Sequence, residues 1–366
     1  MLSVIIPLYN GEKYIKETIE SILCSEYGDI EIVVIDDGST DGGPSIVSTL
    51  AKEHAEVVLY GKENGGVVSA RNYGAEVAHG DYICFADQDD IVKSCMYSKL
   101  IDRLANDDSD MAMCSSGRSI DGMESALDIL EDGLYEGDAI RESLLFPILF
   151  NGMDVPIKHS GGNHYTQIWT CIFKKSFWEE KGLKFRAYIN FEDDYLLKTE
   201  ALSKASKVST VSDIGYLWRI NLGSETYSKH YIDDIGKKQD LEYDDIAKSC
   251  REFAPDDAFL DYYKKSLYCK QYIDAIHNLN NLHKKLSRKQ ILEYFYDNIY
   301  SRDFDNCIKG RKLVKKGRIK LRVILPILAG RHTFFSLYAE KILDKILVLS
   351  LKSQKLTLLE RRLKKR

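Results

Sequence analysis

Short apolar segments alternate with helix-like segments along the first 90 residues of the chain. The apolar runs predict β-strands at residues 3–7, 31–35, 56–60 and 82–86. Apolar residues recur at helical spacing between these runs, over residues 15–23, 46–50 and 68–78. Strands that alternate with helices at this spacing form right-handed βαβ units. We therefore expect a doubly wound, mostly parallel sheet of the α/β class.

The last of these strands runs directly into an acidic cluster. Asp87, Asp89 and Asp90 follow the apolar run within four residues. Open α/β sheets bind their ligands at the carboxyl ends of the strands, which is where these side chains would lie. Carboxylates this close repel one another unless a cation lies between them, and Mg²⁺ or Mn²⁺ suits such a set. The alternative is an acidic turn that caps the following helix.

The usual phosphate-binding loops are missing from the sequence. No Gly-x-Gly-x-x-Gly follows the first strand, and no Gly-x-x-x-x-Gly-Lys-Ser/Thr occurs anywhere. These absences disfavour dinucleotide redox chemistry and P-loop hydrolysis. A metal ion held by Asp87 and Asp89 is then the expected binding partner for a diphosphate.

The second half of the chain changes character near residue 230. Residues 168–173 predict a further strand, and Glu192, Asp193 and Asp194 lead into a predicted helix that continues through Leu202. From about residue 233 the pattern is helical almost throughout, with a capping-box sequence at 287–290. We therefore predict a sheet domain over residues 1–230 and a helical region over residues 231–366.

Composition favours a cytoplasmic protein. The eight cysteines form no Cys-x-x-Cys pair and no zinc-ligand spacing with histidine, so they are expected to be reduced thiols. The chain starts directly with a predicted strand, which argues against a signal peptide. No apolar run approaches the length of a membrane span.

Charge is distributed unevenly along the chain. Residues 309–366 contain 18 Lys and Arg against three acidic residues, a local charge of +15 within a chain of net charge −5. This basic tail suggests an anionic surface as its partner, with peripheral attachment to the inner face of the cell membrane as one interpretation. The alternative is that its apolar residues pack on the preceding helices. No nucleic-acid partner is expected, and homo-oligomer formation stays open.

Four motifs together resemble the inverting family-2 glycosyltransferases of the GT-A fold. They are Val4-Ile5-Ile6-Pro7-Leu8-Tyr9-Asn10, Val34-Ile35-Asp36-Asp37-Gly38-Ser39-Thr40-Asp41, Asn64-Gly65-Gly66 with Ala70-Arg71-Asn72, and Asp87-Gln88-Asp89-Asp90. Trp169, the cluster at 191–194, and Arg219 with Ser224 also look like that family. The resemblance covers roughly residues 1–225, whereas the helical remainder has no such match.

The resemblance implies roles for residues around the nucleotide. Tyr9 resembles the residue that stacks on the nucleobase, and Asp37 the one that binds a uracil edge. Pro7, Asn64 and Arg71 look like further nucleotide contacts. Gln88 stands where a smaller residue is common, so the pocket near the ribose is expected to differ slightly.

The resemblance also implies the metal and catalytic positions. Asp87 matches a contact to the ribose or the metal, and Asp89 a metal ligand. Asp193 matches the catalytic base, with Glu192 beside it in a supporting role. Arg219 and Ser224 are weaker matches, since this region varies in length within the family. A direct displacement with one base inverts the anomeric carbon.

The expected function is therefore transfer of Glc, Gal, GlcNAc or GalNAc from a UDP-sugar, with Mn²⁺ or Mg²⁺ as cofactor. The resemblance implies a saccharide hydroxyl on a lipid or protein carrier as acceptor, in the assembly of surface polysaccharides or glycoconjugates. The alternative is a protein of the same fold that only binds nucleotide sugars, or a scaffold that docks partners through its helical tail.

Overall fold

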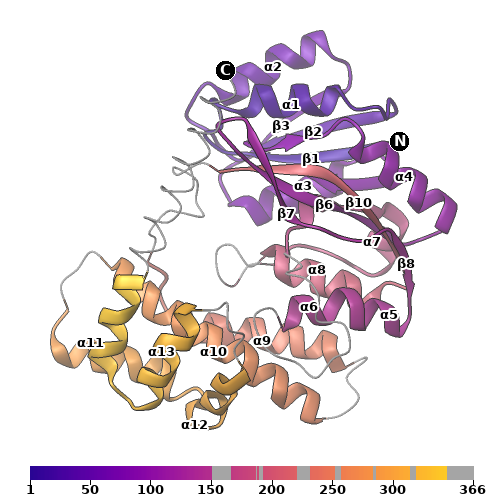
Figure 1. Ribbon diagram of the computed structural model, residues 1–366. Helices are drawn as coiled ribbons and strands as arrows, with labels where there is room; N and C mark the ends of the chain where they lie inside the picture. Colours follow the sequence, from indigo (N-terminus) through magenta and orange to yellow (C-terminus); the bar gives the residue numbers. More distant parts are fainter. Residues whose placement is uncertain are drawn as a thin grey trace, which may run out of the picture. The chain divides into compact units, whose positions relative to one another are not determined.

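The computed structural model contains two compact units (Figure 1). The first comprises residues 1–148 and 161–221, and the second residues 149–160 and 222–366. The structure describes residues 1–150, 166–186, 188, 193–220, 231–251, 257–282, 286–313 and 319–343. The basic tail beyond residue 343 lies outside the described residues. A functional domain boundary at residue 230 stays a prediction.

One sheet forms the centre of the first unit. Its strands follow the order β3-β2-β1-β4-β9-β6-β10-β5, with β7 paired to β6 and β8 to β10. The strands are β1 (Leu2–Leu8), β2 (Ile30–Asp36), β3 (Val57–Gly61), β4 (Tyr82–Phe85), β5 (Ile91–Val92), β6 (Met111–Ile120), β7 (Met123–Asp128), β8 (Gly133–Glu136), β9 (Cys171–Lys174) and β10 (Lys207–Arg219). This α/β sheet confirms the predicted fold class.

The first four strands pair in parallel, as the alternation of strands and helices predicts. β1 lies between β2 and β4, and β3 flanks β2. The connecting helices are α1 (Ile15–Leu23), α2 (Gly43–Glu53) and α3 (Val67–Val77). α3 approaches the sheet closely, because a Cβ atom at Gly74 would lie 2.3 Å from Cγ2 of Ile5. Because these four strands run in parallel, their carboxyl ends lie at one edge of the sheet.

Beyond β4 the sheet is mixed rather than mostly parallel. β9 pairs antiparallel with both β4 and β6, whereas β10 pairs parallel with β6. The strand predicted over 168–173 is partly wrong, since 168–170 form a 3₁₀ turn, η2 (Ile168–Thr170), before β9 begins. This turn places Trp169 against the ring of Tyr216. The remaining helical segments of this unit are α4 (Met96–Asp107), α5 (Asp138–Ile140), η1 (Arg141–Leu145), α6 (Phe146–Leu149), α7 (Lys175–Glu180) and α8 (Asp193–Lys204).

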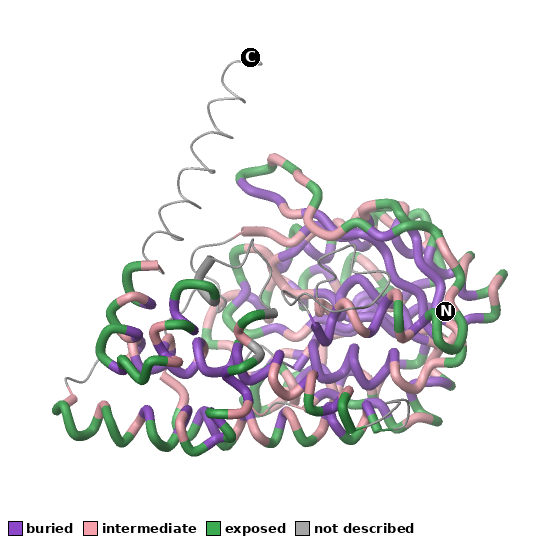
Figure 2. Tube along the Cα trace, turned by 60° about the horizontal axis from the view of Figure 1, so that its bottom comes forward, coloured by how far each residue is buried: buried purple, intermediate pink, exposed green. Residues whose placement is uncertain are grey.

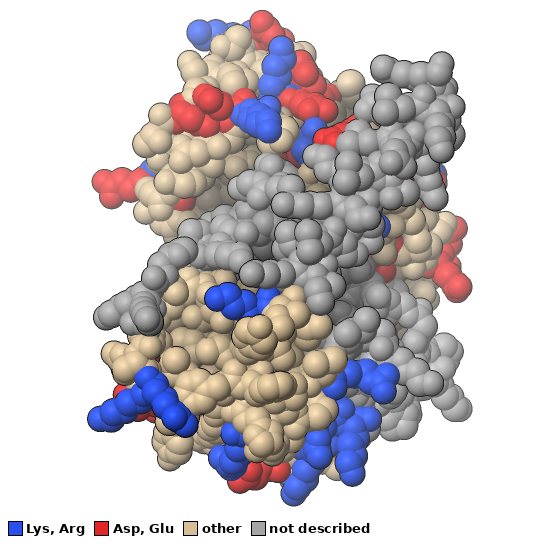
Figure 3. Space-filling view, turned by 60° about the vertical axis from the view of Figure 1, so that its left-hand side comes forward, with Lys and Arg blue, Asp and Glu red and all other residues tan. Residues whose placement is uncertain are grey.

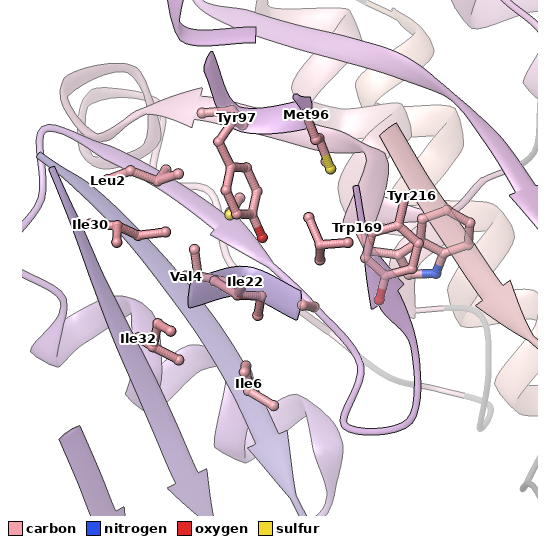
Figure 4. Packing of buried hydrophobic residues seen from close by; sticks show 14 of the residues in the cluster. Leu2, Val4, Ile6, Ile22, Ile30, Ile32, Met96, Tyr97, Trp169 and Tyr216 are labelled. Atoms are coloured by element: carbon pink, nitrogen blue, oxygen red, sulfur yellow. The ribbon is translucent and has the colours of Figure 1, made fainter. Parts of the chain in front are cut away.

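Alternate residues of β1 and β2 enter a core shared with α1, α2 and α4. Leu2, Val4 and Ile6 of β1 and Ile22 of α1 belong to one cluster of buried side chains (Figure 4). Figure 2 marks the buried stretches of the chain in purple along the Cα trace. The opposite face of β1 carries Ile5, which lies against α3. Burial on both faces explains why these strands appear in the sequence as continuous apolar runs.

The second unit is helical. Its described helical segments are α9 (Ile235–Arg251), α10 (Asp257–Asn281), α11 (Arg288–Phe295), η4 (Tyr296–Tyr300), α12 (Phe304–Cys307), η5 (Ile308–Leu313) and α13 (Ile319–Ala329), with residues 333–343 also helical. The predicted capping box is confirmed, since Ser287 and Gln290 bond to each other's backbone N–H at the start of α11. α10 supplies much of the buried core, including Cys269, Tyr272 and Ile276.

Two expectations from composition can be compared with the structure. All eight cysteines are free, and six of them are buried, whereas Cys24 is exposed and Cys95 half-buried. Within the described part of the chain, no helix is both long and apolar enough to cross a membrane.

Candidate active site

The acidic turn after β4 is held in place by two neighbouring elements. The backbone N–H of Asp87 donates to the Tyr216 hydroxyl at 2.9 Å. The ring of Tyr216 stacks on that of Trp169, with 4.1 Å between the ring centres. The Thr18 hydroxyl of α1 lies 3.0 and 2.8 Å from the carbonyl oxygens of Gln88 and Asp90. Thr18 and Tyr216 were missed by sequence reasoning, because neither carries a signal of its own. They fix the backbone that presents the carboxylates.

Arg71 of α3 joins carboxylates from two distant segments. Its Nη1 donates to Asp193 at 2.6 Å and to Asp194 at 2.7 Å, and its Nη2 donates to Asp87 at 2.8 Å. The Arg71 side chain is only 6% exposed. The predicted base and the predicted metal ligand therefore meet at one guanidinium, although they lie more than 100 residues apart in sequence.

This cluster is strongly charged for a buried place. Burial lowers the pKa of Arg71, but the charges of Asp194, Asp87 and Asp193 outweigh it and raise that pKa overall. Burial also raises the pKa of Asp194, and Asp193 and Asp87 add to this effect against the pull of Arg71. Asp194 is anchored further by the N–H of Ile168 at 3.1 Å. One guanidinium is thus hydrogen-bonded to three carboxylates. The sequence did not predict this cluster.

Asp89 lies beside this cluster in a partly buried position. Burial and the charge of Asp87 raise the pKa of Asp89 to about 6. The Nε of Arg219 donates to the backbone oxygen of Asp89 at 2.7 Å, and the charge of Arg219 only partly offsets the rise in the pKa of Asp89. A divalent cation would relieve the repulsion between Asp89 and Asp87, so the donor chemistry fits the predicted metal site.

The protein supplies only part of such a coordination sphere. Within the described ranges, no group of three or more His, Cys, Asp or Glu side chains is arranged to hold a metal ion. Mg²⁺ and Mn²⁺ sites that carry substrate phosphates commonly use one or two carboxylates from the protein. The pair Asp87 and Asp89 matches this kind of site, and the metal assignment stays a prediction.

Gln88 of the acidic turn is hydrogen-bonded to the backbone of Tyr9, the residue predicted to stack on the nucleobase. Its Oε1 accepts from the N–H of Tyr9 at 2.9 Å, and its Nε2 donates to the carbonyl oxygen of Tyr9 at 3.0 Å. Tyr9 itself is 50% exposed, which leaves its ring accessible for stacking. A Cβ atom at Gly11 would lie 2.3 Å from Oε1 of Gln88, so a side chain at this position would displace Gln88 from its contacts with Tyr9. The unusual Gln88 is therefore built into the site.

Asp37 organises the loop between β3 and α3. Its carboxylate accepts from the N–H groups of Gly65 at 3.0 Å and Gly66 at 2.7 Å, and from Nζ of Lys62 at 2.5 Å. Asn64 donates its side-chain amide to the carbonyl oxygen of Asp37 at 2.9 Å. A carboxylate has about four acceptor positions, so one remains for the N–H of a uracil. The predicted uracil contact stays open, with a structural role now added to it.

The other predicted site residues divide into two groups. Pro7 pairs with Ile35 near the carboxyl end of β1. Arg219 lies beside the acidic turn. Its backbone N–H donates to the Asp90 carboxylate at 2.8 Å, and its guanidinium pairs with Glu17 at 2.9 Å. Glu192 and Ser224 lie outside the described residues.

Replacing Gln88 with Ala should weaken UDP binding about tenfold, with little change in kcat. The substitution removes two hydrogen bonds to Tyr9, each worth about 0.5–1.5 kcal/mol. Calorimetric titration with UDP measures the change. In a Tyr9→Ala background the same substitution should cost much less, because the ring that Gln88 positions is gone. An equal cost in both backgrounds would contradict this role.

Comparison with known proteins agrees with this geometry. The sequence profile of the family "Glycosyl transferase family 2" matches residues 3–129. Glycosyltransferase GlyG of Streptococcus pneumoniae serotype 4 is 31% identical over 228 residues, which cover 61% of this chain and 72% of GlyG. The chain belongs to glycosyltransferase family 2.

A second relative in this class is the uncharacterized glycosyltransferase EpsJ of Bacillus subtilis. It is 29% identical over 234 residues, which cover 62% of this chain and 63% of EpsJ. Because family 2 holds many activities and the match leaves over a third of EpsJ uncovered, the activity of the whole protein is a matter for proposal.

The fold of this family-2 chain resembles a solved structure along almost its whole length. Staphylococcus aureus TarS 1–349, determined in complex with UDP-GlcNAc, superposes with a TM-score of 0.64. The alignment covers 94% of this chain and 91% of TarS 1–349 at 20% sequence identity. At this identity the likeness establishes the GT-A fold and nothing about the ligand of this chain.

Proposed function

We propose that the protein is an inverting glycosyltransferase that moves a hexose or N-acetylhexosamine from a UDP-sugar to a hydroxyl of a saccharide acceptor. One observation carries the proposal. A connected set of contacts lies at the carboxyl ends of the parallel strands. Gln88 bonds to Tyr9 and is adjacent to Asp87 in the sequence. Arg71 then joins Asp87 to Asp193. A nucleobase platform, a diphosphate region and a base thus share one edge of the sheet, in a family whose members transfer sugars.

The chemistry follows from what the bond change needs. The acceptor hydroxyl attacks the anomeric carbon, and its proton passes to the carboxylate of Asp193 as the bond to the UDP oxygen breaks. Arg71 donates to this carboxylate at 2.6 Å and thereby orients it. A single displacement inverts the anomeric centre, and no second nucleophilic carboxylate is needed.

A divalent cation completes the proposal. Asp89 and Asp87 would hold Mn²⁺ or Mg²⁺ together with the two phosphates of the donor. A bound cation of this kind offsets the negative charge of the departing diphosphate. Burial and the charge of Asp87 raise the pKa of Asp89 despite the opposing charge of Arg219, which is consistent with a carboxylate pair that accepts a cation.

The donor sugar is inferred from a neighbour in fold. TarS, the structural neighbour, was determined with UDP-GlcNAc, and we extend this donor to the present chain as one of four candidates with UDP-Glc, UDP-Gal and UDP-GalNAc. The acceptor is proposed to be a saccharide on a lipid or protein carrier in the assembly of surface polysaccharides or glycoconjugates.

A donor screen tests the proposal. Purified protein is incubated with each of the four UDP-sugars and with short oligosaccharide acceptors, and UDP release is measured with and without Mn²⁺. We expect release from one or two donors well above the others, and only with the cation. UDP binding without release from any donor would favour the alternative, a protein that only binds nucleotide sugars.

Metal dependence gives a separate expected result. A chelator should abolish transfer, and Asp89→Ala should leave under about 1% of the activity at any Mn²⁺ concentration, because metal ligands commonly contribute several kcal/mol to the transition state. Glu124→Ala serves as a control, since Glu124 forms an ion pair with Lys93 whose side chains are 49% and 34% exposed. Full activity of chelated enzyme contradicts the metal proposal.

We also propose that the protein works at the inner face of a membrane. The support is the charge of +15 over residues 309–366, interleaved with apolar residues. Removing the residues after Leu343, which keeps the buried Glu340 and its contacts with His277 and Asn280, should leave a folded enzyme that acts on a short soluble acceptor and binds anionic vesicles more weakly. Unfolding of the truncated chain would instead mean that the tail belongs to the core of the helical unit.

A further inference from the structure

Helical residues 333–343 bury three polar side chains and expose several large apolar ones, while Leu337, Ala339 and Leu343 pack against the core of the helical unit. Thr333, Ser336 and Glu340 are 6%, 0% and 0% exposed, respectively. The opposite face carries four large apolar residues, of which Phe335 and Tyr338 are 65% and 63% exposed. The other two are Phe334 and Ile342, at 39% and 41%. A helix that only packs on a core shows the reverse arrangement.

Specific contacts fix this orientation of the helix. Glu340 pairs with Nδ1 of His277 at 2.9 Å and accepts a hydrogen bond from Nδ2 of Asn280 at 2.5 Å. Thr333 lies 3.0 Å from the hydroxyl of Tyr300. A rotation that buried the aromatic residues would break these contacts and leave a buried carboxylate without partners, which is costly. The outward apolar face is therefore part of the fold of the helical unit.

Two basic residues lie beside this face. The guanidinium of Arg288 lies 5.2 Å from the ring centre of Phe334, and Lys341 is exposed between Tyr338 and Ile342 in the sequence. Residues 303–344 contain ten Lys and Arg against four acidic residues, of which Asp305 pairs with Arg331 and Glu340 is buried. Figure 3 shows Lys and Arg side chains, with a few Asp and Glu among them, around a largely uncharged area on the helical unit.

We propose that this aromatic face, formed by Phe334, Phe335, Tyr338 and Ile342, binds an anionic lipid surface. Aromatic rings enter the headgroup region of a bilayer while neighbouring Lys and Arg side chains contact its anionic lipids. Charge argues against a second copy of the chain as the partner, because two such faces would bring their basic residues together. The face consists of described residues, so it is a contact surface beyond the tail after residue 343.

Vesicle binding by the full-length chain tests this proposal. The probe is a sedimentation assay with vesicles of phosphatidylcholine containing 30% phosphatidylglycerol, compared with pure phosphatidylcholine, at about 50 and 500 mM NaCl. We expect binding to the anionic vesicles alone, and a strong loss at high salt. The variant Phe335→Gln with Tyr338→Gln should bind at least tenfold more weakly, since glutamine is compatible with a helix but avoids the interface.

Two further variants make the result specific. Ile129→Gln with Leu134→Gln removes two exposed apolar side chains from the first unit, 53% and 43% exposed, and should bind vesicles like the original protein. Lys341→Glu changes an exposed charge without touching the aromatic residues, and should weaken binding at least fivefold at low salt. UDP release with a soluble acceptor should stay unchanged in all three variants, so this test and the test of catalysis fail independently.

Several outcomes would overturn the proposal. The first is full-length protein that ignores anionic vesicles at low salt. A second is a Phe335→Gln, Tyr338→Gln variant that binds like the original, which would assign binding to the tail alone. A third outcome combines two observations: the full-length protein binds no vesicles, and it forms a dimer in analytical ultracentrifugation that the Phe335→Gln, Tyr338→Gln variant does not form. This result would make the face a contact between two copies of the chain.

Discussion

Replacing Asp193 with Asn is expected to slow sugar transfer by about 10²- to 10⁴-fold, while UDP binding stays nearly unchanged. Asparagine has almost the same shape but cannot take the proton of the acceptor hydroxyl. Steady-state rates with saturating donor and acceptor measure the loss, and calorimetric titration with UDP measures the binding. The effect should appear in kcat, because the interaction that is removed forms only as the proton moves.

Asp194 provides the matched control for this substitution. Both carboxylates accept a hydrogen bond from the same Nη1 of Arg71, at 2.6 and 2.7 Å. Asp194→Asn therefore weakens the same ion-pair cluster without removing the proposed base, and should cost much less activity. If Glu192→Gln proves crippling and Asp193→Asn mild, the base has been assigned to the wrong carboxylate.

Replacing Arg71 with Leu is expected to destabilise the fold by about 3 to 5 kcal/mol, because it leaves three neighbouring carboxylates without their cation. The free energy of unfolding from urea titration measures this change. The loss should shrink as the pH falls from 7 toward 5. Burial raises the pKa of Asp194 and Arg71 opposes this rise, so without Arg71 that carboxyl takes up a proton more readily, and protonation relieves the repulsion. Arg71→Lys should be intermediate, since lysine keeps the charge but not the forked geometry.

A surface arginine gives the baseline for this measurement. Arg141 pairs with Asp138 at 2.5 Å, but the two side chains are 38% and 81% exposed. Arg141→Leu should therefore change stability by about 0 to 1 kcal/mol. An Arg71→Leu variant as stable as the Arg141→Leu variant would mean that the cluster contributes nothing to the fold.

Local signals in the sequence predicted the parallel half of the sheet well. Each strand from β1 to β4 is an apolar run next to a helical pattern, and all four pair in parallel, although β4 lies beside β1 and not beside β3. The capping box at Ser287 was predictable for the same reason, since all its contacts lie within four residues. The mixed half was not, because β9 inserts between β4 and β6 from a distant part of the chain.

In the candidate site, too, local features were predictable from the sequence and contacts between distant residues were not. Asp87 and Asp89 could be assigned to the end of a strand from the residues beside them. The contact of Arg71 with Asp193 joins residues far apart in sequence, and a single sequence contains no record of which distant residues meet. The role of Gln88 was also hidden, because its partner is the backbone of Tyr9, and a backbone contact leaves no trace in the type of the partner residue.

Arg71 makes the proposed donor and acceptor ends of the site communicate. A donor-bound cation at Asp87 would compete with Arg71 for that carboxylate, and so would alter the contact that the same guanidinium makes with Asp193 at 2.6 Å. Thermodynamic linkage requires the reverse as well: a ligand that changes the contact of Arg71 with Asp193 must alter affinity at Asp87 by the same factor. Occupancy of the donor end and the placement of the proposed base would then be coupled through a single side chain.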